Sequence, residues 1–180
     1  MSARTFITGF GAFGTVAVNP SAKLAEASKR PFQVLEVAFA AVDEYLTSLN
    51  PESFDRLLML GVAASRERMC PELFGRNFIG KTPDVRGIDL EGEIEAGAPL
   101  LLESTLWTPE IASEIVAFDP HTKLSMDAGE YLCNYISYRA LQRFPEKKVG
   151  FLHIPAEDKL PLDVQMASLT KILEVIERTS

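Results

Sequence analysis

A cysteine and a histidine in this chain are placed where a nucleophilic site could form. Cys133 lies at the start of a predicted helix, where the positive end of the helix dipole favours a thiolate. His153 ends the apolar run VGFLH, which is typical of a strand, and open α/β sheets place their sites at the carboxyl ends of strands. A histidine can take the proton of a thiol and later protonate a leaving amine. The two residues therefore indicate catalysis by a thiolate–imidazolium pair.

Such a pair needs a carboxylate to orient the imidazole, and the sequence offers several. Glu67, Glu72 and Asp84 all follow the predicted central strand, and their spacing does not choose among them. Cys133 and His153 also have a purely structural interpretation, as a small buried apolar residue and a hydrogen-bonded core histidine. Residue types alone leave both interpretations open.

A glycine-rich segment offers a different kind of site. Residues 9–14 read GFGAFG, which is the spacing of a dinucleotide-binding loop, and Glu36 lies about 20 residues further on. The last glycine of that fingerprint should open the helix, whereas Asn19-Pro20 puts the helix start later. Phe10 and Phe13 also suit an apolar ring-shaped ligand better than a phosphate. A nucleotide-binding oxidoreductase is therefore an alternative that rests on glycine spacing alone.

The elements that would position these residues alternate between strand and helix. We predict strands at 4–8, 33–39, 56–62, 122–125 and 148–153, and helices at 20–30, 42–49, 109–116 and 130–144. A last helix carries an apolar stripe with spacings of three and four, formed by Leu162, Met166, Leu169, Ile172, Leu173 and Ile176. Residues 63–107 have no sustained period and are predicted to be irregular or to form a hairpin layered on the main sheet. This order predicts a three-layer α/β domain whose twisted, mostly parallel sheet is flanked by helices.

Composition narrows the class of protein. The chain has 180 residues, 47% of them hydrophobic, which is enough to form a buried apolar core. We therefore expect residues 1–180 to form a single domain. The net charge of −7 would repel a phosphate backbone, which excludes nucleic acid as the expected partner. No apolar run approaches the roughly 18 residues of a membrane span, and the N-terminal apolar stretch is too short for a signal peptide. We expect a soluble, cytoplasmic protein with no membrane partner.

The two cysteines and two histidines give no pattern of a disulfide or metal centre. Isolated thiols in a reducing compartment are structural or catalytic more often than bridged. No Cys or His pair stands at the spacing of zinc ligands. We therefore expect no metal and no cofactor.

Four segments, in order along the chain, resemble the pyroglutamyl peptidase I family. They are TGF with FG and NPS in residues 8–21, GVAASRERMCPELFGRN at 61–77, SMDAGEYLCNYISY at 125–138 and GFLHIP at 150–155. A shorter match, STL, lies at 104–106. The resemblance spans nearly the whole chain and implies a phosphorylase/hydrolase-like α/β fold without a cofactor.

The resemblance also assigns roles to individual residues. It implies that Cys133 attacks the carbonyl of an N-terminal pyroglutamate, that His153 transfers the proton and that Glu72 orients His153. The implied substrate is a peptide with an N-terminal pyroglutamyl residue, and the family often forms homotetramers, so a homo-oligomer is expected.

The substrate pocket follows from the same resemblance. Phe10 and Phe13 would hold the pyrrolidone ring, and Tyr131 and Leu132 match positions that line the pocket in the family. Arg66 belongs to the segment with the glutamate and is expected near the developing oxyanion, where backbone N–H groups beside Cys133 are an equal candidate.

Several positions depart from the family pattern. The family's Gln-Ala-Gly-Gly-Arg is replaced by Val62-Ala63-Ala64-Ser65-Arg66, Arg76 also stands in a changed position, and the loop at 81–87 is shorter. These changes exchange polar groups of the pocket. An alternative hypothesis is therefore a catalytically weakened relative that binds a small lactam or a peptide N-terminus.

Overall fold

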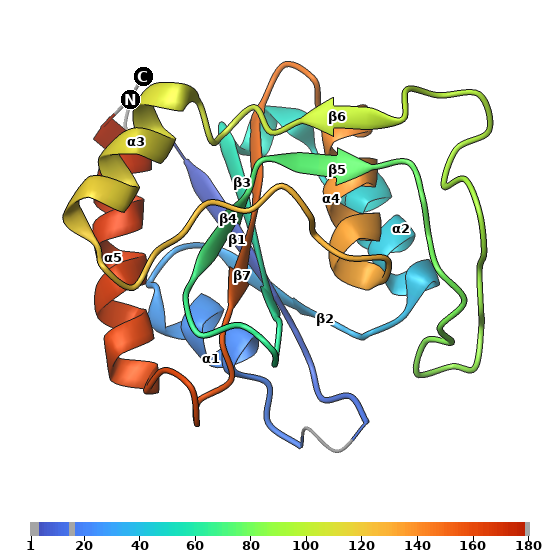
Figure 1. Cartoon of the computed structure of the whole chain (residues 1–180). Coiled ribbons are helices and arrows are strands. Elements are labelled where there is room, and N and C mark those ends of the chain that lie inside the picture. Colours follow the sequence, from blue (N-terminus) through green and yellow to red (C-terminus); the bar gives the residue numbers. More distant parts are fainter. Residues whose placement is uncertain (1–3, 15–16, 179–180) are drawn as a thin grey trace.

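The computed structural model, which describes residues 4–14 and 17–178, has a mostly parallel sheet between two layers of helices (Figure 1). The sheet has the strand order β2-β1-β3-β7-β4. Its strands are β1 (Thr5–Phe10), β2 (Phe32–Leu35), β3 (Arg56–Val62), β4 (Cys70–Glu72) and β7 (Lys148–Ile154). All run parallel except β4, which pairs antiparallel with β7. The predicted three-layer α/β fold is confirmed.

Helices cover both faces of this sheet. One face carries α1 (Pro20–Ala27) and α5 (Leu162–Arg178), with α3 (Pro109–Phe118) packed against α5, and the other carries α2 (Phe39–Ser48) and α4 (Leu132–Arg143). A short 3-10 helix, η1 (Pro51–Ser53), leads into β3. A second sheet of two antiparallel strands, β5 (Phe74–Arg76) and β6 (Leu101–Glu103), packs on α4. The pairing agrees with the hairpin that was one of the two predictions for residues 63–107, but the pair packs on α4 and not on the main sheet.

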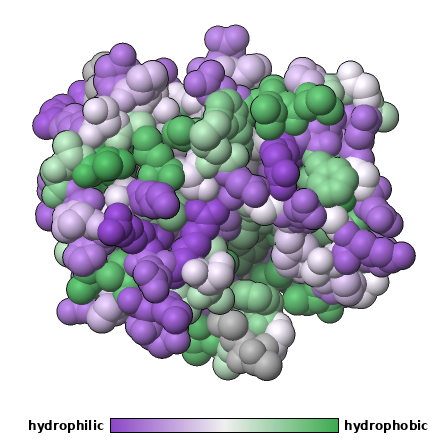
Figure 2. Space-filling model, viewed as in Figure 1, coloured by the Kyte–Doolittle hydropathy of each residue, from purple (hydrophilic) through white to green (hydrophobic). Residues whose placement is uncertain are grey.

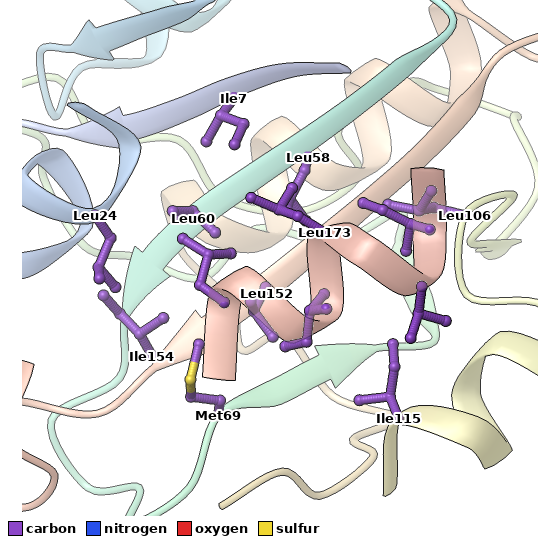
Figure 3. Packing of buried hydrophobic residues seen from close by; sticks show 14 of the residues in the cluster. Ile7, Leu24, Leu58, Leu60, Met69, Leu106, Ile115, Leu152, Ile154 and Leu173 are labelled. Atoms are coloured by element: carbon purple, nitrogen blue, oxygen red, sulfur yellow. The ribbon is translucent and has the colours of Figure 1, made fainter. Parts of the chain in front are cut away.

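Side-chain alternation along the strands divides the core in two. On β3, Leu58 and Leu60 pack beneath α1 and α5 (Figure 3), whereas Leu57 and Met59 pack beneath α2 and α4. The predicted stripe of α5 lies in the first of these clusters, with Leu169, Ile172, Leu173 and Ile176 buried and Leu162 and Met166 partly buried. The strand pattern therefore also decides which residues of β7 face α4.

Two sequence predictions of strands are wrong, the first in its extent and the second altogether. The strand predicted at 33–39 ends at Leu35, and Phe39 already begins α2. The segment 122–125 is not a strand and makes only isolated bridges, between Met69 and Thr122 and between Glu72 and Ser125. Its partner β4 was missed because it has only three residues, one of them a proline, which is tolerated at a sheet edge.

The first half of β7 has no neighbouring strand on its outer side, and residues 104–106, the STL segment, cover it there. β4 reaches along β7 only as far as Phe151. Beyond it, Ser104 donates its hydroxyl hydrogen to the carbonyl of Val149, and Thr105 accepts from the N–H of Val149, both at 2.8 Å. The indole N–H of Trp107 donates to the carbonyl of Phe151 at 3.0 Å. These residues complete the edge of the sheet and have no direct part in chemistry.

The end of β1 is tied to the start of α1 by polar side chains. The Asn19 carboxamide oxygen accepts from Ser21 N–H and caps the helix, as the sequence predicts. Its amide group donates to the carbonyl of Gly11, and the Ser21 hydroxyl accepts from Phe10 N–H at 2.9 Å. A Cβ on Gly9 would lie 2.5 Å from the Ser21 carbonyl oxygen, so this glycine permits close packing of strand on helix. The glycine pattern therefore has a packing reason that needs no nucleotide.

We predict that Gly9→Ala destabilises the protein by about 1–3 kcal/mol, because strand or helix must shift to admit the methyl group. The measurement is urea unfolding followed by circular dichroism. Gly11→Ala is the matched control, since its Cβ would lie 3.5 Å from the nearest heavy atom, the Leu35 carbonyl oxygen. Equal losses of stability in the two variants would show that the close approach at Gly9 is unimportant.

Candidate active site

The predicted site residues meet at the carboxyl edge of the parallel strands. His153 lies near the end of β7, between Gly61 of β3 and Cys70 of the antiparallel β4 in the register of the sheet. Residues paired in this way project their side chains to the same face. For His153 that face is the one covered by α4, whose second residue is Cys133. The chain thus brings a thiol and an imidazole together from a helix start and a strand end.

A buried carboxylate holds the imidazole from the side of β4. Glu72 Oε1 lies 2.6 Å from His153 Nδ1, and the two side chains are 0% and 5% exposed. The other ring nitrogen is free of Glu72, and Cys133 lies close enough to His153 for its charge to act on the ring. The order Glu72–His153–Cys133 is the arrangement in which a carboxylate orients a base and the base serves a nucleophile.

Gly61 makes room for the thiol of Cys133. A Cβ at this position would lie 2.8 Å from the sulfur of Cys133 and 2.7 Å from the ring of Phe151. No side chain larger than hydrogen therefore fits between β3 and the thiol. The absence of a side chain lets the sulfur lie against the sheet beside His153.

The imidazole of His153 is held in its protonated form. Burial of the ring opposes protonation, but the charge of Cys133 and hydrogen bonds to Cys133 and Glu72 outweigh it and raise the pKa of His153 from 6.5 to about 9. The protonated ring therefore faces the sulfur of Cys133 with a positive charge. Cys133 also lies in the first turn of α4, where the helix dipole acts in the same direction.

Arg66 contacts the carboxylate and lies outside the apolar pocket beside Cys133. Its Nη2 lies 2.8 Å from Glu72 Oε1, the same oxygen that meets His153, and it donates to the Asp127 carbonyl at 2.7 Å. The second carboxylate oxygen of Glu72 is buried and accepts no hydrogen bond within the described residues. Arg66 therefore joins the loop after β3 to Glu72 and to the segment that leads into α4.

A small apolar pocket opens beside the thiol. Its volume is about 80 Å³, and it is lined by Phe10, Phe13, Asn19, Val37, Val62, Tyr131, Leu132 and Cys133. At roughly 10–15 Å³ for each water-sized sphere, it admits a ligand of about half a dozen heavy atoms. The hydroxyl of Tyr131 donates to the carbonyl of Pro83 at 3.0 Å, which fixes this wall of the pocket. A compact, mostly apolar ring fits such a space.

Four of the five residues predicted to bind substrate line this pocket. Phe10, Phe13, Tyr131 and Leu132 surround it, whereas Arg66 contacts Glu72 instead. Sequence reasoning missed Val37, which was placed inside a strand, and used Asn19 only as a helix cap. No local pattern marks Val37, because only the approach of β2 to β1 brings it to the site.

Other residues in the matching segments hold the site without entering it. The Asn134 carboxamide donates to the carbonyls of Arg76 and Phe78 and accepts from Arg76 N–H, which ties β5 to α4 one residue after Cys133. Asn77 makes a similar clasp on Glu95. Asn134 thus fixes the start of α4 relative to the second sheet, whereas Asn77 fixes the loop between β5 and β6.

Two further classes of site have no basis in the described part of the chain. No three His, Cys, Asp or Glu side chains there come together as metal ligands would. None of the helices in residues 4–14 and 17–178 combines the length and apolar character that a membrane crossing requires.

Comparison with known proteins points to one family. The family profile described as pyroglutamyl peptidase matches residues 3–175. A pyrrolidone-carboxylate peptidase of Thermococcus onnurineus is 32% identical over 199 residues, covering 98% of this chain and 98% of that protein. One of Oceanobacillus iheyensis is 29% identical over 182 residues, covering 93% and 92%. The structure of a mutant pyrrolidone carboxyl peptidase from Pyrococcus furiosus matches with a TM-score of 0.87 and 26% identity, over 97% of this chain and 98% of that one.

We predict that iodoacetamide modifies Cys133 well before Cys70 at pH 6.5. Cys133 is partly exposed beside an imidazolium, whereas Cys70 is 5% exposed. The imidazolium is present below a pKa of about 9 and is lost above it, so the advantage of Cys133 should shrink as the pH rises through 9. The measurement is peptide mass mapping over time, with Cys70→Ala as the control for assignment. Labelling of Cys70 first would contradict the placement of the nucleophile.

Proposed function

This chain belongs to the pyroglutamyl peptidase family and is a peptidase, and we propose that it removes the pyroglutamyl residue from the N-terminus of peptides. Its nucleophile is Cys133, its acid and base is His153, and Glu72 orients His153. One observation carries this proposal. The array from Glu72 Oε1 through His153 to Cys133 ends beside a pocket sized for a small apolar ring.

The first half of the reaction forms an acyl-enzyme. The thiolate of Cys133 attacks the carbonyl carbon of the pyroglutamyl residue, and the C–S bond forms as the carbonyl oxygen takes the negative charge. His153, protonated at neutral pH, gives its proton to the leaving nitrogen as the C–N bond breaks. The peptide leaves with a free amine and the pyroglutamyl group remains as a thioester on Cys133.

The second half restores the enzyme. His153, now neutral, takes a proton from water as the water oxygen attacks the thioester carbon. Breakage of the C–S bond releases pyroglutamate and returns the thiolate beside the imidazolium. Glu72 keeps Nδ1 hydrogen-bonded throughout, so that the opposite ring nitrogen carries every proton transfer.

The start of α4 supplies donors for the oxyanion. The N-cap residue Tyr131 makes no side-chain cap hydrogen bond, so the first N–H groups of α4 are not occupied by a capping side chain. The N–H of Cys133 itself belongs to this turn and lies next to the reacting carbon. Arg66 acts on Glu72, as its 2.8 Å contact indicates, and the oxyanion role falls to the backbone.

The apolar pocket explains the choice of a blocked N-terminus. A pyroglutamyl ring has no free α-amine, whereas an ordinary peptide N-terminus carries a charge. Placing that charge among Phe10, Phe13 and Leu132 costs desolvation energy. The lining of the pocket contains no carboxylate that could offset this cost. The pocket therefore selects against ordinary peptides by penalty as much as by fit.

We predict that Cys133→Ala and His153→Ala each lower kcat on a fluorogenic pyroglutamyl amide by at least about a thousandfold, and that the double variant loses little more. The two side chains act as one unit, so their effects do not add. His121→Asn, a change of the other histidine, is the control and should keep full activity. Comparable turnover in Cys133→Ala would refute a cysteine mechanism.

We further predict that Val62→Gln raises kcat/KM for pyroglutamyl amides by about threefold to tenfold, the worth of one hydrogen bond of about 0.5–1.5 kcal/mol. Val62 lines the pocket at the position where the family pattern given above has glutamine, and the change adds donors and an acceptor to an apolar wall. The pH profile should not change, because His153 and Glu72 are untouched.

Val62→Leu is the matched control, since it adds volume without a polar group, and it should give no gain. If Val62→Gln also gives none while the wild type is already fast on pyroglutamyl substrates, the pocket has been rebuilt around valine.

A further inference from the structure

A second, larger hollow lies on the other side of His153 from the apolar pocket. It has a volume of about 620 Å³, and its lining includes Arg66, Glu67, Arg68, Cys70, Lys123 and Ser125. We call it the basic pocket, because three cations face one exposed carboxylate, that of Glu67. Figure 2 shows hydrophilic side chains gathered on this face over the loop that follows β3 and the segment that precedes α4.

The order of the strands sets the direction in which a substrate must lie. The apolar pocket is built on β1 and β3, through Phe10 and Val62. His153 stands on β7, the next strand, and Cys70 of the basic pocket stands on β4, the strand after that. The apolar pocket, the histidine and the basic pocket therefore follow one another along a single edge of the sheet.

The chemistry gives this order a meaning. The acyl part of the substrate fills the apolar pocket, and the leaving nitrogen receives its proton from His153. The peptide beyond that nitrogen therefore continues away from β3, toward β4. That direction leads to the basic pocket, whose nearest member, Arg66, contacts the carboxylate bound to His153.

Two cations of the basic pocket have no partner of opposite charge. Arg66 is paired with Glu72, but within the described residues neither Arg68 nor Lys123 takes part in an ion pair. The whole chain carries a net charge of −7. The two unpaired cations thus give the basic pocket a positive electrostatic potential on an otherwise negatively charged protein. A positive potential attracts an anionic group.

The walls of the basic pocket are fixed before any ligand arrives. Met69 N–H donates to the His121 carbonyl at 2.8 Å, and Lys123 N–H donates to the Met69 carbonyl at 2.9 Å. Ser125 N–H then donates to the Pro71 carbonyl at 3.0 Å. The segment bearing Lys123 is therefore bound alongside β4 and the loop bearing Arg68, so the backbone at both cations is fixed before a ligand binds.

We propose that the basic pocket receives the leaving part of the substrate and binds a carboxylate in it through Arg68 and Lys123. The inference rests on the proposed function and adds a substrate class: pyroglutamyl peptides that carry an acidic residue, or the C-terminal carboxylate, just after the scissile bond. Peptides with a basic residue there are poor substrates. A leaving group without charge gains nothing from the pocket.

The test compares kcat/KM across pyroglutamyl dipeptides whose second residue is Asp, Ala or Lys, each as free acid and as C-terminal amide. We expect Asp to exceed Lys by about fivefold or more in the amide series, the worth of one or two exposed ion pairs, and to lose this lead at high salt. The free acid of the Ala dipeptide should exceed its amide if the C-terminal carboxylate reaches the pocket. Equal values for Asp and Lys amides would overturn an acidic side chain as the ligand, and equality throughout would overturn the proposal.

Variants locate the effect. Arg68→Gln/Lys123→Gln should bring the ratio of Asp to Lys substrates close to one while leaving hydrolysis of pyroglutamyl aminomethylcoumarin, whose leaving group is uncharged, unchanged. Lys147→Gln/Lys148→Gln removes the same amount of charge near the start of β7, at the opposite end of the strand from His153, and should keep the ratio. A ratio that survives in the first variant, or falls equally in the second, would refute the basic pocket as its source.

The coumarin substrate separates the two levels of the proposal. If the wild type fails to hydrolyse it, the proposed function fails and the inference falls with it. If it is hydrolysed and the dipeptides show no dependence on charge, only the inference fails.

Discussion

The buried contact between Glu72 and His153 is the interaction on which the rest of the site depends. The two groups lie 2.6 Å apart and are almost fully buried, so removing them from water costs desolvation energy. Only a contact of good geometry offsets this cost. The pairing of β4 with β7 supplies that geometry, since it places Glu72 and His153 on neighbouring strands and on one face. Arg66 adds a second cation to the same oxygen, so the carboxylate faces positive charge from both sides. Without this contact the imidazole would lose its orientation and part of what raises the pKa of His153, to which Cys133 also contributes.

Most polar side chains around the site hold backbone segments together. Asn19 and Ser21 fasten the loop that carries Phe10, and Asn134 fastens the start of α4. Ser104 covers the free edge of β7. Each side chain satisfies backbone groups that irregular segments would otherwise leave unpaired in a buried place. The segments that resemble the family therefore contain residues that hold the backbone around the site as well as residues proposed to react.

The edge of the sheet separates two environments that suit two halves of one substrate. On the β1 side the walls are aromatic and aliphatic, and a charged group would lose its hydration there. On the β4 side the walls carry arginine and lysine and remain open to water. His153 stands between them, at the place where the bond breaks and an amine is released in the proposed reaction. A neutral ring on one side and a charged peptide on the other can thus both be accommodated without a change of fold.

The sequence by itself determined the fold class, the bounds of β3 and the apolar stripe of α5, because periodicity is a local property that each segment carries alone. It also supplied Cys133 and His153 as the candidate nucleophile and base, but its residue types left Glu67, Glu72 and Asp84 open as the carboxylate, and only the resemblance to the family favoured Glu72. The structure separates them: Glu67 is exposed, Asp84 accepts hydrogen bonds from the N–H groups of Phe39, Arg86 and Ile88, and Glu72 meets His153. That contact joins residues 81 positions apart, and it exists only through the register of a three-residue strand. So short a strand has no detectable period of its own, and its pairing with β7 is fixed by tertiary packing, which is why only the tertiary structure decided that Glu72 meets His153.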